Sequence, residues 1–211
     1  VELGCGGVLM LPPFYYKGVP EEGLYRNFSE IIQRVGDDRL RIYLYHIPPV
    51  AQVGIPLGLI ERLLKDYPGI VAGAKDSSGD WSNTKAMIDN FAAQGFDVYP
   101  GSESFLLQAM RAGGAGCISA TANVNPGPIA KLAATWQGDD ADAQQEGLNV
   151  TRGIFQTYVM IPALKAAIAH YGRDPEWNRL RPPLVELTAD EQKDLVAKLD
   201  ASGFTMPGLA A

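Results

Sequence analysis

Five short apolar runs alternate with longer amphipathic segments along residues 6–120. The runs are rich in β-branched and aromatic residues, which is typical of strands buried on both faces. They are residues 6–11, 41–47, 70–75, 96–101 and 115–120. The segments between them place apolar side chains on one helical stripe, such as Leu24, Phe28 and Ile31 within residues 21–35. This alternation with short connections predicts an α/β fold built on a parallel sheet or barrel.

The strand pattern stops after Asn125, and helical segments follow. They cover residues 126–136, 141–158, 161–171 and 188–201. The last one begins with a capping-box pattern, in which Thr188 is followed three residues later by Glu191. We therefore divide the chain into about five βα units over residues 1–137 and a helical region over residues 138–211.

The amino-acid composition indicates which partners the protein can bind and where in the cell it is located. The chain is 46% hydrophobic with a net charge of −6 and has no basic patch, which disfavours nucleic acids and membrane surfaces as partners. No apolar run approaches the roughly 20 residues of a membrane span, and we expect no leader peptide. Cys5 and Cys117 lie in apolar, glycine-rich runs, so we interpret them as reduced core thiols of a cytoplasmic protein. With His46 and His170 as the only histidines, we expect neither a metal nor a cofactor.

Lys75 is the residue that most strongly indicates chemistry. It ends the apolar run 70–75 and precedes the polar turn from Asp76 to Asp80. Lysine is rarely buried without a partner, and the C-terminal ends of the strands in an α/β barrel face the active site. An unprotonated amine at that edge forms a Schiff base with a carbonyl substrate, and burial favours the unprotonated form. The alternative is a lysine that only extends its charged end to solvent.

Tyr45 lies near the end of the preceding run. Successive strands of a parallel barrel are neighbours, so we expect the Tyr45 phenol and the Lys75 amine to meet at one rim. A tyrosine there can transfer protons as a general acid–base, although an aromatic side chain that merely packs on the next helix gives the same pattern. Gly101 and Ser102 end the following strand, where a glycine either lets the backbone approach a ligand or forms a plain turn. Ile118 lies near the end of the last apolar run, and we expect its side chain to line the pocket at the ends of the strands.

The motif Tyr45-His-Ile-Pro48, followed by Gly73-Ala-Lys75-Asp-Ser77, resembles a signature of the dihydrodipicolinate synthase / N-acetylneuraminate lyase family. Similar stretches are Pro13-Phe-Tyr-Tyr16, Glu22-Gly-Leu-Tyr25, Gly116-Cys-Ile-Ser-Ala-Thr-Ala-Asn123 and the tail that begins at Arg181. The resemblance spans essentially the whole chain. It implies a (β/α)8 TIM barrel with a C-terminal helical region. It also implies a class I Schiff-base aldolase or lyase that acts on pyruvate or another 2-oxo acid, without a cofactor or metal, as a homo-oligomer (dimer or tetramer).

The resemblance also implies roles for individual residues. Lys75 matches the Schiff-base lysine, and Tyr45 matches the proton-transferring tyrosine. Tyr16 matches a tyrosine that family members contribute across a dimer interface. Gly101 and Ile118 match positions that line the pyruvate pocket. The other substrate-binding residues that we predict are Ser77, Ser102 and Glu103.

The first departure from the family pattern concerns the strands. The family's barrel has eight strands, whereas this chain carries a pattern that matches strands four to eight. The Gly-Thr-Thr-Gly-Glu-type loop that binds the pyruvate carboxylate belongs to the first three strands and is absent from the sequence. We therefore interpret the chain, which opens with Val1, as an N-terminally truncated member of the family. We expect such a chain alone to fold poorly and to lack activity, because five strands leave open edges.

The second departure is Val50, where dihydrodipicolinate synthases carry an arginine that binds the carboxylate of the aldehyde substrate. A valine cannot make that bidentate contact. The N-acetylneuraminate lyases carry an acidic pair and a serine at positions where this chain has Glu103, Ser104 and Ala120. We therefore predict a lyase, aldolase or dehydratase that acts on a sugar-acid-like substrate. The alternative within the enzyme class is 4-hydroxy-tetrahydrodipicolinate (dihydrodipicolinate) synthase, and the alternative outside it is a catalytically silent paralogue that binds 2-oxo acids.

Overall fold

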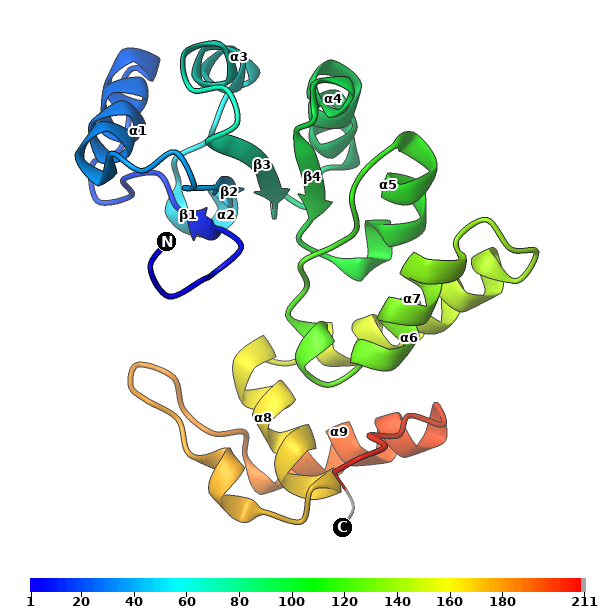
Figure 1. Ribbon diagram of the computed structural model, residues 1–211. Helices are drawn as coiled ribbons and strands as arrows, with labels where there is room; N and C mark the ends of the chain where they lie inside the picture. The colour runs from blue at the N-terminus through cyan, green and yellow to red at the C-terminus, as the bar shows by residue number, and fades with distance from the viewer. Residues whose placement is uncertain (210–211) are drawn as a thin grey trace. The chain divides into compact units, whose positions relative to one another are not determined.

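The structure, a computed structural model, describes residues 1–209. These residues form two compact units, one that comprises residues 1–118 and one that begins at Ser119. Within the described residues the first unit holds all the strands, and the second is helical (Figure 1). The division at residues 137 and 138 follows the periodicity of the sequence and stays a prediction.

Parallel strands form the sheet of the first unit, in the order β1-β2-β3-β4. Their bounds are Val8–Met10 for β1, Ile42–His46 for β2, Val71–Asp76 for β3 and Asp97–Pro100 for β4. Helices connect successive strands, so strands that follow one another in the sequence pair in the sheet. The helices are α1 (Glu21–Val35), α2 (Pro48–Ala51), α3 (Leu57–Asp66), α4 (Trp81–Phe91) and α5 (Leu106–Ala112), and the 3-10 turns are η1 (Ala92–Gln94) and η2 (Glu103–Phe105). The predicted α/β fold with a parallel sheet is confirmed.

The hydrophobic core of the first unit lies between the sheet and helices α1, α3 and α4, which Figure 1 shows on one side of the strands. Leu44, Ala74 and Val98 extend from the three longest strands into this core and are fully buried. They belong to one cluster with helical residues such as Phe28 and Leu59. Because side chains alternate between the two faces of a strand, the residues before and after these three point to the opposite face.

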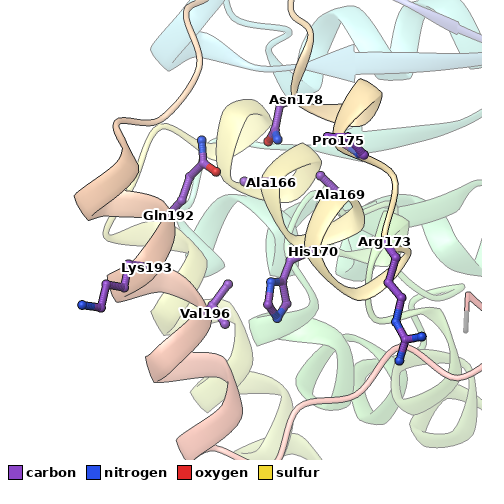
Figure 2. A pocket seen from close by; sticks show the side chains of 9 residues that line it. All are labelled: Ala166, Ala169, His170, Arg173, Pro175, Asn178, Gln192, Lys193 and Val196. Atoms are coloured by element: carbon purple, nitrogen blue, oxygen red, sulfur yellow. The ribbon is translucent and has the colours of Figure 1, made fainter.

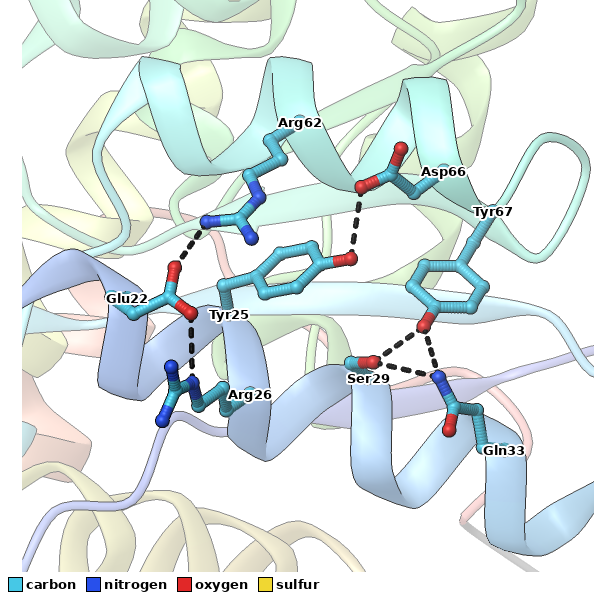
Figure 3. Close-up of polar contacts among 8 residues, drawn as sticks. All are labelled: Glu22, Tyr25, Arg26, Ser29, Gln33, Arg62, Asp66 and Tyr67. Carbon is cyan, nitrogen blue, oxygen red and sulfur yellow. Dashed lines mark hydrogen bonds and ion pairs between the residues drawn. The ribbon is translucent and has the colours of Figure 1, made fainter.

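Polar contacts join α1 to α3 on the outside of the helical layer (Figure 3). Arg62 of α3 donates to Glu22 of α1, and this hydrogen bond is the main reason why the pKa of Glu22 lies below its ordinary value. Tyr25 donates through its hydroxyl to Asp66 at 2.8 Å. The hydroxyl of Tyr67, just after α3, contacts polar side chains of α1. The ion pair between Arg62 and Glu22 is largely open to solvent, so it helps to orient the two helices and adds little stability.

The fifth predicted strand is not a strand in residues 1–209. Ala115 donates its backbone N–H to the Val98 carbonyl at 3.0 Å, and Ile118 donates to the Pro100 carbonyl at 3.1 Å. The segment thus lies beside β4 and forms these two backbone hydrogen bonds with it. Gly116 has a φ of 140°, a conformation that interrupts a regular extended ladder. The sheet order also ends at β4 within the described part of the chain, so no strand pairs with the other edge of this segment.

The prediction that both cysteines are core thiols is wrong for Cys5. Cys5 is exposed, whereas Cys117 is half-buried. The physical reason is that β1 begins only at Val8, after a turn in which Gly4 donates to the Val1 carbonyl at 3.0 Å. In the part of the chain that the structure describes, no helix has both the length and the apolar character that crossing a membrane requires.

Helices pack around a separate core in the second unit. They are α6 (Pro126–Thr135), α7 (Ala141–Gln156), α8 (Met160–Tyr171) and α9 (Ala189–Ala201), with the 3-10 turns η3 (Thr121–Asn123) and η4 (Pro175–Asn178). Phe155, Ala167, Leu195 and Leu199 are buried in its core. The predicted capping box is confirmed at the start of α9, where Glu191 donates its N–H to the Thr188 hydroxyl at 3.2 Å and its carboxylate accepts from the Thr188 N–H at 2.8 Å.

Candidate active site

Lys75 and Tyr45 lie side by side on the face of the sheet that points away from the helices. They are partners in the register of β3 and β2. The Lys75 amine donates to the Tyr45 hydroxyl at 3.1 Å, and its Nζ lies 4.3 Å from the centre of the Tyr45 ring. Both side chains are half-buried. The structure therefore brings together an amine and a phenol at hydrogen-bond distance, which is the arrangement that proton transfer at a Schiff base needs.

Tyr99 on β4 is the other neighbour of Lys75, and the sequence interpretation did not single it out. Lys75 and Tyr99 are register partners, so the lysine stands between two tyrosines. Below them, the rings of Tyr43 and Tyr99 meet edge to face with centroids 5.9 Å apart, and the Tyr43 hydroxyl lies 3.4 Å from the Asp97 carboxylate. Burial is the main cause that raises the pKa of Tyr43 and of Tyr99, with a smaller contribution from Asp97. Both phenols are therefore neutral hydrogen-bond donors near pH 7.

Gly73 makes room for this aromatic layer. A β-carbon at Gly73 would lie 2.7 Å from Cδ1 of Tyr43 and 2.3 Å from the carbonyl oxygen of Asp97. Any side chain there would push apart β3 and β4, which hold Lys75 and Tyr99. The signal that was available in the sequence is the spacing of the tyrosines: Tyr43 and Tyr45 are two residues apart and must share a face.

A row of backbone hydrogen bonds brings three predicted substrate-binding residues to the same edge of the sheet as Lys75. Ser77 donates to the carbonyl at the end of β2 at 2.7 Å, Gly101 donates to the Asp76 carbonyl at 2.6 Å, and Ile118 donates to the carbonyl at the end of β4 at 3.1 Å. Gly101 packs closely on Ser77, because a β-carbon at position 101 would lie 2.0 Å from the Ser77 hydroxyl oxygen. These residues stand where the carboxyl ends of parallel strands present a ligand site.

The other two predicted substrate-binding residues are Ser102, which has a local structural role, and Glu103, which is buried. The Ser102 hydroxyl accepts from the Ser104 N–H at 3.2 Å and begins the turn η2. Glu103 is completely buried. Their contacts with a substrate stay predictions.

Tyr16 lies on the loop between β1 and α1, at the same edge of the sheet as Lys75. Its ring is 68% exposed and packs edge-on against Tyr15, with centroids 5.2 Å apart. Within residues 1–209 no hydrogen bond joins Tyr16 to Lys75 or Tyr45. A side chain this exposed is available to a second molecule, and its role across an interface stays a prediction.

Asp76 anchors the turn that follows Lys75, and the sequence interpretation missed it. Its carboxylate is 3% exposed and points to the helical side. It accepts hydrogen bonds from the Thr84 hydroxyl at 2.7 Å, the Ser78 N–H at 2.9 Å and the Asn83 amide at 3.0 Å. A buried carboxylate with three donors is well satisfied. It holds the end of β3, and therefore the backbone of Lys75, against the start of α4.

One of the hollows of the second unit lies between α8, η4 and α9 and has a volume of about 510 Å³. Figure 2 shows the charged ends of Arg173 and Lys193 extending to opposite sides of it, with the His170 ring between them. No cluster of three or more histidine, cysteine, aspartate or glutamate side chains that could hold a metal ion occurs in residues 1–209.

Comparisons with known proteins show which family the chain resembles. The model of the dihydrodipicolinate synthetase family matches residues 1–202. A DapA-like lyase of uncharacterised function from Chloroflexus aurantiacus is 35% identical over 90% of this chain and 63% of its own length. A 4-hydroxy-tetrahydrodipicolinate synthase from Thermodesulfovibrio yellowstonii is 32% identical over 96% of this chain and 68% of its own length. The chain thus spans about two thirds of the length of these curated relatives.

Solved structures show the same fold. Dihydrodipicolinate synthase from Agrobacterium tumefaciens superposes with a TM-score of 0.85 at 29% identity, over 95% of this chain and 67% of that one. YagE from Escherichia coli K12, solved in complex with pyruvate, superposes with a TM-score of 0.84 at 24% identity over 96% of this chain and 68% of that one. The prediction of an α/β barrel followed by helices is confirmed, with β1 to β4 as the strands of the described residues. The chain belongs to the dihydrodipicolinate synthetase family.

Proposed function

We propose that this chain carries the catalytic lysine and tyrosine of a lyase or aldolase that acts on pyruvate or a related 2-oxo acid through a Schiff base. The observation that carries the proposal is the hydrogen bond of 3.1 Å between the Lys75 amine and the Tyr45 hydroxyl. Family membership supports it, since relatives bear the names lyase and synthase. The proposal applies to the protein in its complete form and includes a cytoplasmic location.

The chemistry follows from the two side chains. The unprotonated Lys75 amine attacks the keto carbon of the 2-oxo acid, and loss of water gives an imine. In a lyase or aldolase reaction the protonated imine accepts the electrons of the bond between the α and β carbons, so that this bond breaks, an enamine forms and the β carbon leaves as a carbonyl after its hydroxyl loses a proton. In a dehydratase reaction the α carbon loses a proton to give the enamine, whose electrons then expel the hydroxyl of the β carbon as water. Tyr45 moves the proton that each of these steps requires. In this proposal Gly101 and Ile118 border the substrate, with Ser77, Ser102 and Glu103 as further contacts.

For the second substrate we propose a sugar-acid-like compound. Val50 supports this choice, because it is 75% exposed on α2 and its side chain offers no partner to a carboxylate. The relatives that bear the name 4-hydroxy-tetrahydrodipicolinate synthase favour that activity as the second candidate. Substitution of Val50→Arg should create synthase activity with aspartate semialdehyde if this one side chain separates the two activities.

We also propose that the protein works as a homo-oligomer, either a dimer or a tetramer. The loop after β1 exposes three neighbouring aromatic side chains, Phe14, Tyr15 and Tyr16, at 55%, 83% and 68%. Contiguous exposed aromatic surface is typical of an interaction site. Sedimentation velocity of the wild type and of Tyr16→Ala tests the proposal, which predicts that the substitution shifts the distribution towards smaller species.

Borohydride trapping tests the Schiff base. Reduction in the presence of pyruvate should add the pyruvate-derived group to the peptide that contains Lys75, as mass spectrometry of a digest can show. Lys75→Arg should abolish the adduct. Lys85→Arg is the matched control, because Lys85 belongs to the same unit but is paired with Asp89 on the surface. A folded protein that gives no adduct would support the catalytically silent paralogue instead.

A further inference from the structure

A hollow of about 380 Å³ lies on the helical side of the sheet, behind the strand that carries Tyr45. His46 lines it and follows Tyr45 on β2, so the two side chains point to opposite faces. Three more polar side chains line it: Glu21 at the start of α1, Gln52 after α2 and Asn83 in the first turn of α4. The rest of the wall is backbone and apolar side chains. We name this hollow the His46 pocket.

His46 offers a hydrogen-bond donor to this pocket. Its Nδ1 accepts the Ile55 N–H at 3.0 Å. A neutral imidazole that accepts at one nitrogen carries its proton on the other, so the proton is on Nε2. Burial lowers the pKa of His46, against a smaller opposing effect of Asp76, and so favours the neutral ring.

The Nε2–H of His46 has no acceptor among residues 1–209, although the side chain is only 7% exposed. Since this nitrogen is not among the fully buried atoms that lack a partner, it reaches solvent and can be hydrated. A hydroxyl or carbonyl oxygen of a ligand can replace that water as the acceptor.

At the mouth of the pocket, the Glu21 carboxylate favours a positively charged group of a ligand. One of its carboxylate oxygens would lie 3.4 Å from a β-carbon at Gly58, which places the group against the start of α3. No lysine, arginine or histidine forms an ion pair with Glu21 in the described part of the chain. A free carboxylate repels anions and attracts an ammonium group. Asn83 uses its amide N–H for Asp76 at 3.0 Å, so its carbonyl oxygen remains as an acceptor for a ligand hydroxyl.

We propose that the His46 pocket binds a small polyhydroxylated amine, whose hydroxyl oxygen accepts from the Nε2–H of His46 and whose ammonium group binds Glu21. The site is distinct from the Lys75–Tyr45 pair, because it lies on the other face of the sheet. One backbone contact and one side-chain contact connect the sites: the His46 carbonyl accepts from the Ser77 N–H, and the Asn83 side-chain amide donates to the carboxylate of Asp76, the residue after Lys75.

D-glucosamine is the probe that tests this proposal, and D-glucose is its matched control without the ammonium group. Titration of the ¹⁵N-labelled protein is followed by NMR at the Ile55 amide and at the ring nitrogens of His46, which are assigned by comparison with His170. We expect saturable shifts at both positions with glucosamine and much weaker ones with glucose. We also expect the free protein to show Nδ1 of His46 without a proton.

Three variants complete the test. Glu21→Gln removes the charge of an exposed side chain and should weaken glucosamine binding about tenfold or more. His46→Asn retains an oxygen that can accept from the Ile55 N–H but removes the Nε2 donor, and should also weaken binding. Glu30→Gln, on the same helix but outside the pocket, should bind as the wild type does. Equal binding of glucose and glucosamine, wild-type affinity of Glu21→Gln, or a proton on Nδ1 would overturn the proposal.

Discussion

The buried hydroxyl of Thr84 allows a quantitative test of how the turn after Lys75 is held. Thr84 is 1% exposed and donates to the Asp76 carboxylate at 2.7 Å. Thr84→Val keeps the shape of the side chain and removes this donor. A hydrogen bond to a charged group contributes about 1.5–3 kcal/mol. The extra methyl group of valine returns about 0.8 kcal/mol through burial. We therefore expect the free energy of unfolding to fall by about 1–2 kcal/mol.

Urea unfolding followed by circular dichroism measures this change, which corresponds to a midpoint about 0.5–1 M lower. The same substitution at Thr135 is the control, because its hydroxyl bonds to the Lys131 carbonyl on an exposed helix surface and its loss should cost less than about 0.5 kcal/mol. In an Asp76→Asn background the effect of Thr84→Val should shrink, since the charged acceptor is gone. Two results would show that the hydrogen bond from Thr84 to the Asp76 carboxylate does not stabilise the fold. One is that Thr84→Val costs the same stability in the wild type and in Asp76→Asn, and the other is that Thr84→Val and Thr135→Val cost the same.

Three further predictions concern the sheet, the pH dependence of stability and the reaction. Gly73→Ala should lower the free energy of unfolding by about 1–3 kcal/mol, because a methyl group there has no room between the strands; urea unfolding measures this. Because burial depresses the pKa of His46, the unfolded state binds a proton more readily, so stability should be constant at high pH and fall as the pH drops below about 6.5. The urea midpoint of His46→Asn should lose part of this dependence between pH 8 and 5.5, whereas that of His170→Asn should retain it. Finally, Tyr45→Phe should slow the trapping of the pyruvate adduct by about a hundredfold or more, measured by quenched mass spectrometry, while Lys85→Arg reacts at the wild-type rate.

Local patterns in the sequence were sufficient for most elements. The alternation of apolar runs and helical stripes predicted all of the observed strands, and the spacing of Thr188 and Glu191 predicted the start of α9. These features depend on residues within one turn of a helix or within one strand. The same reasoning failed for residues 115–120, where an apolar run had only two hydrogen bonds to β4 and a glycine at a φ of 140°. Whether an apolar run becomes a strand depends on its partners, which are distant in the sequence.

The candidate site likewise contains residues that the sequence predicted and residues that it did not. Lys75 and Tyr45 were predictable as a pair, since each falls near the end of an apolar run and successive parallel strands are neighbours. Tyr99 and Asp76 were not predicted. The place of Tyr99 beside Lys75 depends on the register between β3 and β4, and the three donors to Asp76 include two from the first turn of α4. Register and helix docking are set by packing over the whole unit, so no short stretch of sequence contains them.

The sequence by itself determined the α/β class, the helical character of the residues after Asn125 and the amine that is the candidate nucleophile. The tertiary structure decided the geometry: the 3.1 Å contact of Lys75 with Tyr45, and the hydrogen bond from Ile55 that places the proton of His46 on Nε2. The physical reason lies in the range of the interactions. Periodicity and helix caps act between residues that are near in the sequence, whereas the protonation and orientation of a side chain depend on groups that only the folded chain brings within about 3 Å.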